Sequence, residues 1–259
     1  MNLIQVFVLS LVEGLTEFLP ISSTGHLILV SKLFGILETD FVKTFQIVIQ
    51  LGAILAVVTL YSKRLLTSFN LLKKLMVAFI PTAIVGFTLY PLIKGVLLGS
   101  SVITLNALFW GGVAIIFVEK LLKNSKNPKL QESKSKDPTY RQALVIGTFQ
   151  SLSVVPGVSR AAATILGARI MGLDRSTAAE FSFLLAVPTM FAATGLDVWK
   201  SRDMIATSGF LTLFVGTVLS FFFAVLAVKF LVNYVKKHDF TVFGIYRIIL
   251  AILFWLFVK

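Results

Sequence analysis

Long apolar runs alternate with short basic segments along this 259-residue chain. Six runs approach the roughly 20 residues that a membrane-spanning helix needs. We predict spans at residues 44–62, 75–92, 101–119, 181–198, 208–232 and 241–258. The pattern therefore predicts an all-α, polytopic membrane protein, with residues 1–259 forming a single integral membrane domain.

Two regions break this pattern. The first is an apolar stretch from Leu3 to Phe34, which is interrupted by Pro20 and Gly25. The second covers residues 142–180 and contains V-V-P-G-V-S-R in mid-segment. The pieces are short for spanning helices, and irregular backbone is tolerated at membrane depth only where it lines a cavity. Each region therefore predicts a re-entrant helical hairpin, which enters and leaves on one side.

The two interrupted regions align when the chain is shifted on itself by about 136 residues. The shift places Pro20 on Pro156, Ser23 on Ser159 and, with one residue of slippage, Gly35 on Gly172. We predict a first repeat at about 1–119, a cytoplasmic basic linker at about 120–141 and a second repeat at about 142–259. Each repeat has a hairpin and three spans, and because three is odd the second is inverted. Interrupted segments at matching places in inverted repeats indicate a site near the membrane midplane.

The composition supports a membrane location and narrows the partners. The chain is 57% hydrophobic and 14% charged, whereas soluble proteins are about 25% charged. Its net charge of +12 indicates cytoplasmic loops near anionic lipid, and nucleic acid is not an expected partner. The absence of cysteine excludes disulfides and a thiol nucleophile.

The distribution of lysine and arginine predicts the orientation. The loop after the first span, the linker and the loop near residues 233–240 are the basic ones, which places them in the cytoplasm. Both termini and the mouth of the first hairpin then lie outside. We therefore expect an active site that is open to the outer face.

The first break holds an unusual set of polar residues. Glu13 and Glu17 are four residues apart and share a helix face. A carboxylate at the centre of a spanning helix costs about 2.5–3.5 kcal/mol, so both are expected to face a cavity. Candidate partners in that cavity are Ser22, Ser23, Thr24 and His26.

The second break adds a phosphate-binding candidate. Arg160 offers a planar, permanently charged fork that suits phosphate oxygens, and Ser159 precedes it. A half-helix that begins near Ala161 would present free N–H groups at its positive end. The chain has no G-x-x-x-x-G-K-[ST] phosphate loop.

Together these residues suit phosphoryl transfer on an amphiphilic substrate that arrives from the lipid. Ser23 is the candidate nucleophile, since a hydroxyl beside a base is readily activated, although attack by water stays open. His26 is either the base or the acid that protonates the leaving group. Glu13 and Glu17 would orient the imidazole, act as the base or hold a divalent cation.

Two alternatives stay open at this point. Ser22, Ser23 and Thr24 also suit the cap of a half-helix. A transporter or flippase for a polyprenyl phosphate lipid would share the inverted repeats and would also need Arg160. It would not need a hydroxyl surrounded by two acids and a histidine, which favours the enzyme.

Two motifs resemble those of a known family. The segment E-G-L-T-E-F-L-P-I-S-S-T-G-H-L at 13–27 and P-G-V-S-R at 156–160 are similar to the signatures of bacterial undecaprenyl-diphosphate phosphatases of the bacitracin-resistance type. The likeness spans nearly the whole chain. It implies hydrolysis of undecaprenyl diphosphate to undecaprenyl phosphate, the lipid carrier of peptidoglycan synthesis, in the bacterial plasma membrane.

The resemblance also assigns roles to residues. It implies that Ser23 is the nucleophile and that Glu13, Glu17, Ser22, Thr24, His26 and Arg160 belong to the same site. Together with the residue chemistry above, we expect Ser23, Glu17, His26 and Glu13 to be catalytic, Arg160, Ser159, Ser22 and Thr24 to bind substrate phosphate, and Glu13 and Glu17 to be candidate metal ligands. The expected cofactor is a divalent cation, Mg²⁺ or Ca²⁺, with no organic cofactor. The expected partners are a polyprenyl diphosphate lipid and the bilayer, and a homodimer is compatible with the sequence.

The chain departs from the family at two places. The family usually continues its second signature with serine and glycine, where this chain has Ala161 and Ala162. An acidic residue is also common where this chain has Gln46. We therefore leave Ala161 out of the predicted site and expect no negative charge at Gln46, which leaves the main cluster unaffected.

Overall fold

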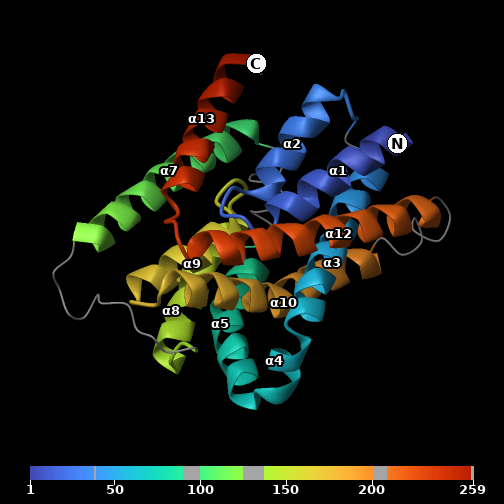
Figure 1. The fold of residues 1–259 in the computed structure, drawn as a ribbon. Helices are drawn as coiled ribbons and strands as arrows, with labels where there is room; N and C mark the ends of the chain where they lie inside the picture. The colour runs from blue at the N-terminus through green and yellow to red at the C-terminus, as the bar shows by residue number, and fades with distance from the viewer. Residues whose placement is uncertain (38, 90–99, 125–136, 201–208, 258–259) are drawn as a thin grey trace.

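The computed structural model describes residues 1–37, 39–89, 100–124, 137–200 and 209–257, and its regular structure is helical (Figure 1). The helices are α1 (Leu3–Thr16), α2 (Ser23–Leu33), α3 (Asp40–Leu60), α4 (Ser62–Thr67), α5 (Phe69–Thr88), α7 (Ser101–Asn124), α8 (Tyr140–Ser151), η3 (Leu152–Val154), α9 (Arg160–Ile170), α10 (Arg175–Lys200), α12 (Phe210–Val235) and α13 (Thr241–Phe257). The predicted all-helical membrane fold is confirmed.

Five helices of the described chain are long and apolar enough to cross a membrane: α3, α5, α7, α10 and α12. The predicted span 241–258 corresponds to α13, whose 17 described residues fall short of that length. A sixth crossing therefore stays a prediction. The span predicted at 75–92 begins earlier, at Phe69, so that Lys73 and Lys74 lie inside α5.

Part of the linker predicted at residues 120–141 is helical in the structure. Helix α7 continues to Asn124 and α8 already begins at Tyr140, so both ends of the predicted linker at 120–141 are helical. Residues 125–136 of the linker lie outside the described ranges.

Both predicted breaks are confirmed as turns between two packed helices, α1 with α2 and α8 with α9. Ser22 and Ser159 immediately precede α2 and α9, and each has a φ of 73°, in the left-handed region. Each serine side chain accepts a hydrogen bond from a backbone N–H three residues on. This cap helps to offset the cost of the backbone conformation.

The register predicted between the two turns is wrong by one residue. The structure gives Ser22, not Ser23, the same place as Ser159, and the two serines are 137 positions apart. The reason is a difference in turn length: one residue separates Pro20 from Ser22, whereas two separate Pro156 from Ser159. Ser23 therefore corresponds to Arg160 as the first residue of its helix.

The long helices hold the two turns near the centre of the molecule (Figure 1). Helix α12 packs against α1 and α3, α5 packs against α8, α10 contacts both α3 and α9, and α13 pairs with α7. The largest core cluster includes Phe18 from the first turn, Ala161 and Ala162 from α9, and Phe183 from α10. Burial of these residues fixes the turns against the long helices.

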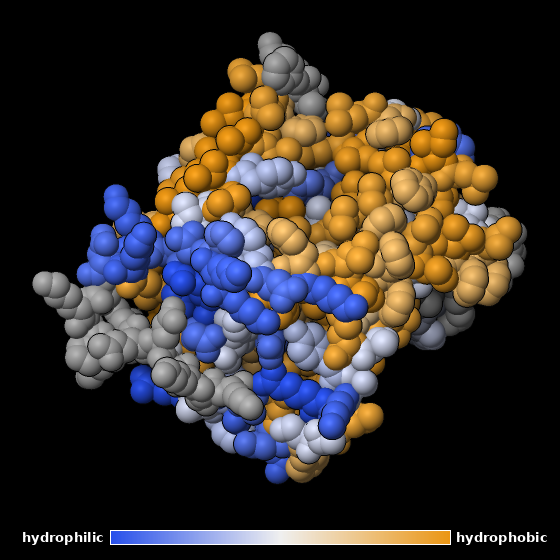
Figure 2. Space-filling model, in the orientation of Figure 1, coloured by the Kyte–Doolittle hydropathy of each residue, from blue (hydrophilic) through white to orange (hydrophobic). Residues whose placement is uncertain are grey.

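The surface divides into apolar and hydrophilic regions. Figure 2 shows hydrophobic residues over α1 and α12, where Leu3, Phe210 and Phe222 are exposed, as expected of a face that contacts lipid. Hydrophilic residues gather at the lower left of the view, where Figure 1 places α4, α8 and the end of α7.

Candidate functional site

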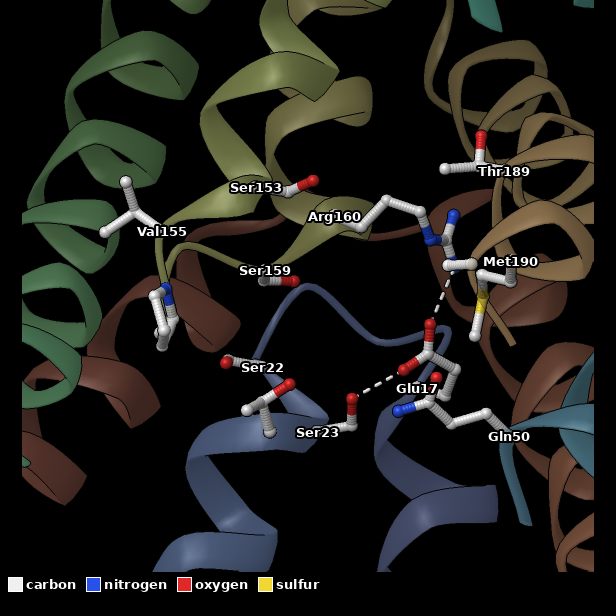
Figure 3. Close-up of a pocket in the computed structure, with 14 residues that line it drawn as sticks. Glu17, Ser22, Ser23, Gln50, Ser153, Val155, Ser159, Arg160, Thr189 and Met190 are labelled. Atoms are coloured by element: carbon white, nitrogen blue, oxygen red, sulfur yellow. Dashed lines mark hydrogen bonds and ion pairs between the residues drawn. The ribbon is translucent and has the colours of Figure 1, made fainter. Parts of the chain in front are cut away.

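A pocket of about 170 Å³ lies where the two turns meet (Figure 3). Polar side chains from both turns face it, together with residues of α3 and α10. The lining residues are Glu17, Ser22, Ser23, Thr24, Gln50, Ser153, Val155, Pro156, Gly157, Ser159, Arg160, Thr189, Met190 and Ala193. The predicted hairpins thus contribute to one site.

Glu17 joins the two halves of this site. Ser23 Oγ donates a hydrogen bond to Glu17 Oε2 over 2.5 Å, and Arg160 Nη2 pairs with Glu17 Oε1 over 3.2 Å (Figure 3). The Glu17 and Arg160 side chains are each only 9% exposed. A buried charge needs such a partner, so Ser23, Glu17 and Arg160 form one coupled group.

Arg160 is further held by α10. Its Nη1 donates to the backbone carbonyl of Ser182 over 2.8 Å, and its guanidinium lies 5.5 Å from the centre of the Phe18 ring. Thr164 Oγ1 donates to the Arg160 carbonyl over 2.8 Å and accepts a hydrogen bond from Ser182 Oγ over 2.6 Å. The guanidinium is therefore fixed in direction before any substrate arrives.

The four predicted phosphate-binding residues all line the pocket. Ser22 and Thr24 come from the start of α2, and Ser159 and Arg160 come from the start of α9. Two helix N-termini therefore meet at one pocket, and each presents the positive end of its dipole. This arrangement attracts an anion without a phosphate-binding loop.

Glu13 and His26 lie close to the pocket residues but do not line the pocket. Glu13 is fully buried one helical turn before Glu17, and neither of its carboxylate oxygens has a hydrogen-bond partner in the described part of the chain. The His26 Nδ1 atom is 2.8 Å from the Ser22 carbonyl oxygen, and its Nε2 atom is 2.7 Å from the Tyr246 hydroxyl. Because a carbonyl only accepts, Nδ1 carries the proton and Nε2 accepts from Tyr246.

The two glutamates provide some, but not all, of the ligands that a divalent cation needs. Within the described residues no group of three or more His, Cys, Asp or Glu side chains could enclose a metal. Mg²⁺, however, is commonly held by one or two carboxylates together with substrate phosphates. The carboxyl oxygens of Glu13, which have no hydrogen-bond partner in the described part of the chain, suit this use.

Sequence reasoning missed five residues around the pocket. Gln50, Ser153 and Thr189 line it, and Ser182 and Thr164 support Arg160. A polar amide within the apolar run of α3 is a signal that could have identified Gln50. The other four carry small hydroxyls, which are common in membrane helices and give no comparable signal.

Ala161, which we left out of the predicted site, and Ala162 are buried in the core and do not line the pocket. Gln46 likewise lies outside the pocket lining and donates a hydrogen bond to Ser31.

The chain is similar to proteins of one family throughout its length. The family model described as bacitracin resistance protein BacA matches residues 6–253. The chain is 52% identical to the undecaprenyl-diphosphatase of Persephonella marina, with 100% of both chains covered. It is 50% identical to that of a Sulfurihydrogenibium species, with 99% of each covered, and 47% identical to that of Aquifex aeolicus, with 96% of each covered. The chain therefore belongs to the bacitracin resistance protein BacA family.

Proposed function

We propose that this protein is an integral membrane phosphatase that hydrolyses undecaprenyl diphosphate to undecaprenyl phosphate and inorganic phosphate. It would thereby recycle the lipid carrier of peptidoglycan synthesis and confer bacitracin resistance. The relatives' names support the substrate. The observation that carries the reaction is the hydrogen-bonded and ion-paired group of Ser23, Glu17 and Arg160 in a pocket between two helix N-termini.

In the proposed reaction, Ser23 Oγ attacks the terminal phosphorus and Glu17 takes the hydroxyl proton. The bond from that phosphorus to the bridging oxygen breaks, the proton passes to the leaving group, and undecaprenyl phosphate departs. Water then cleaves the phosphoserine, which releases inorganic phosphate and restores Ser23. The 2.5 Å contact between Ser23 and Glu17 supports Glu17 as the base.

Arg160 and the N-termini of α2 and α9 stabilise the charge on the transferred phosphoryl group. Such fixed donors favour the transition state because they need no reorganisation during the reaction. His26 has protein partners on both ring nitrogens, which supports a role in holding the turn.

A divalent cation, Mg²⁺ or Ca²⁺, is part of the proposal, with Glu13 and Glu17 as its protein ligands. When bound, it would neutralise charge on the phosphate oxygens. The unpartnered carboxylate oxygens of Glu13 support this assignment.

We also propose that the fold consists of two inverted repeats with six membrane crossings. Several pairs of local features separated by 137 residues support the repeat: the capping boxes of Asn2 with Gln5 and Thr139 with Gln142, the left-handed serines Ser22 and Ser159, and the left-handed glycines Gly35 and Gly172. The packing is also reciprocal, since α1 contacts α12 as α8 contacts α5. A homodimer stays a prediction.

The proposed location is the bacterial plasma membrane, with the pocket reached from the outer face. The position of the basic residues supports this orientation. Lys63 and Arg64 follow α3, Lys120 and Lys123 end α7, and Lys237 follows α12, so these helix ends would lie in the cytoplasm.

The test is phosphate release from a polyprenyl diphosphate by detergent-purified protein. We expect release by the wild type, loss on chelation of divalent cations with recovery when Mg²⁺ or Ca²⁺ is added, and loss in Ser23→Ala and Arg160→Ala. Ser62→Ala and Arg141→Ala, at exposed positions, serve as matched controls. Release retained in Ser23→Ala but lost in Arg160→Ala would assign the attack to water. A folded wild type that releases no phosphate with metal present would overturn the phosphatase and favour lipid transport.

A further inference from the structure

Arg247 lies in the apolar helix α13, yet it is fully buried. It is the largest fully buried side chain in the described residues. A charged residue inside a membrane protein is costly and generally has a functional reason. None of the roles assigned so far uses it.

The Arg247 guanidinium donates five hydrogen bonds, all to backbone carbonyls. Two go to α7, at Leu108 and Ala107, over 3.2 and 2.9 Å. The other three go to the two turns that form the pocket. The acceptors there are Pro20 at 3.3 Å, Val158 at 3.0 Å and Gly157 at 2.8 Å.

These acceptors lie two or three positions before the residues of the proposed reaction. Pro20 precedes Ser23 by three positions, and Val158 precedes Arg160 by two. One planar side chain therefore ties the first turn to the second and both turns to α7. A lysine could not do this, because it has three donors in place of five and no rigid fork.

The neighbouring residue Tyr246 braces the first turn by a second route. Its hydroxyl donates to His26 Nε2 over 2.7 Å, and the two rings are stacked with an angle of 2° between them. His26 Nδ1 in turn donates to the carbonyl of Ser22, the residue with left-handed backbone that precedes Ser23. Such a conformation persists only where its surroundings hold it.

The backbone of α7 is shaped to receive Arg247. A Cβ atom added to Gly111 would lie 2.2 Å from Arg247 Nη2, so only glycine leaves room for the guanidinium there. The next residue, Gly112, lies against the Gly244 carbonyl, which brings α7 and α13 close together. The absence of a side chain at Gly111 therefore gives the guanidinium the space it needs to reach its five acceptors.

We propose that Tyr246 and Arg247 are positioning residues that hold the two turns in register, a role that rests on the phosphatase function proposed above. Arg247 sets the distance between Ser23 on one turn and Arg160 on the other. Tyr246, acting through His26, sets the backbone of Ser22 alone.

The test uses Tyr246→Phe, Arg247→Lys and Gly111→Ala in the full-length protein, with Tyr140→Phe, Arg141→Lys and Gly86→Ala as matched controls. Tyr140 and Arg141 are exposed, and a Cβ atom at Gly86 would meet no atom within 4 Å. The first readout is hydrogen exchange of the backbone amides at 21–26 and 157–162, measured by mass spectrometry in detergent. It does not depend on activity.

We expect Arg247→Lys and Gly111→Ala to speed exchange in both turns, Tyr246→Phe to speed it in the first turn only, and the controls to change neither. Unchanged exchange in both turns would overturn the proposal. An equal increase in every helix would also overturn it, because this result indicates general destabilisation.

The second readout is the kinetics of phosphate release. Tyr246→Phe should lower kcat and leave KM close to wild type, because only the Ser23 side of the site shifts. Arg247→Lys should lower kcat by up to about 100-fold, as a displacement of roughly 1 Å can do, and should also raise KM because Arg160 moves. Wild-type kinetics in both variants would contradict the positioning role. Absence of release by the wild type would instead overturn the phosphatase, and the exchange readout would still decide the positioning role.

Discussion

At the scale of single residues, the proposed chemistry depends on Glu17, which contacts two partners at once. One carboxylate oxygen accepts from Ser23, and the other pairs with Arg160. The Arg160 contact gives the buried carboxylate a partner of opposite charge, and the Ser23 contact places it against the proposed nucleophile. A neutral amide at this position would retain the shape and lose the base.

We therefore expect Glu17→Gln to lower kcat by at least about 100-fold, as loss of a general base usually does. Asp40→Asn, which makes the same change at an exposed residue at the start of α3, should leave phosphate release close to wild type. Release by Glu17→Gln at the wild-type rate would remove Glu17 from the role of base.

The sequence predicted the relative position of Glu13 and Glu17 because that signal is local, and it also predicted that the two breaks would share a cavity. Glu13 and Glu17 do lie one helical turn apart, and Ser22, Ser159 and Arg160 do meet in one pocket. It did not show that Glu13 lies behind the pocket, because the depth of a side chain depends on what packs over it.

At the scale of helices, close approach of backbones sets the position of the turns. Gly147 of α8 packs against α5, where a Cβ atom would lie 2.0 Å from the Ala78 carbonyl oxygen. Thr82 of α5 also donates a hydrogen bond to the Gly147 carbonyl over 3.2 Å. The second hairpin is thereby seated against a long helix.

Gly147→Ala should force α8 away from α5 and destabilise the protein by about 1–3 kcal/mol, the usual cost of overpacking. Thermal unfolding in detergent measures the effect. Gly86→Ala, on α5 itself, should not lower the stability, since no atom lies within 4 Å of the added methyl group and alanine favours a helix. A Gly147→Ala protein as stable as Gly86→Ala would show that α8 does not need this close contact.

The helix breaks were predictable because proline and glycine act on their own neighbours in the chain. The register between the two turns was not, since it depends on the one extra residue between Pro156 and Ser159. Arg247 was overlooked although it interrupts an apolar run. Its role can be inferred only from the structure, in which carbonyls about 90 to 230 positions away accept its hydrogen bonds.

At the scale of the whole molecule, the two hairpins face each other across the centre, and the basic helix ends gather on one side (Figures 1 and 2). This arrangement predicts which loops share a compartment. The absence of natural cysteines makes the orientation directly testable.

We expect a cysteine in place of Leu37, 79% exposed after α2, to react in intact cells with a thiol reagent that does not cross membranes. A cysteine in place of Lys237, which is exposed between α12 and α13, should react only after the cells are permeabilised. The reverse pattern would place the pocket mouth on the cytoplasmic side.

The central claim is that residues from both hairpins form one catalytic unit, and a double-mutant cycle tests it most directly. Phosphate release is measured for wild type, Glu17→Gln, Arg160→Lys and the double variant. Residues that act as a unit give non-additive losses, so we predict a double variant no slower than the worse single variant. Losses in kcat/KM that multiply fully would show that Glu17 and Arg160 act independently, which would contradict a single site shared by the two turns.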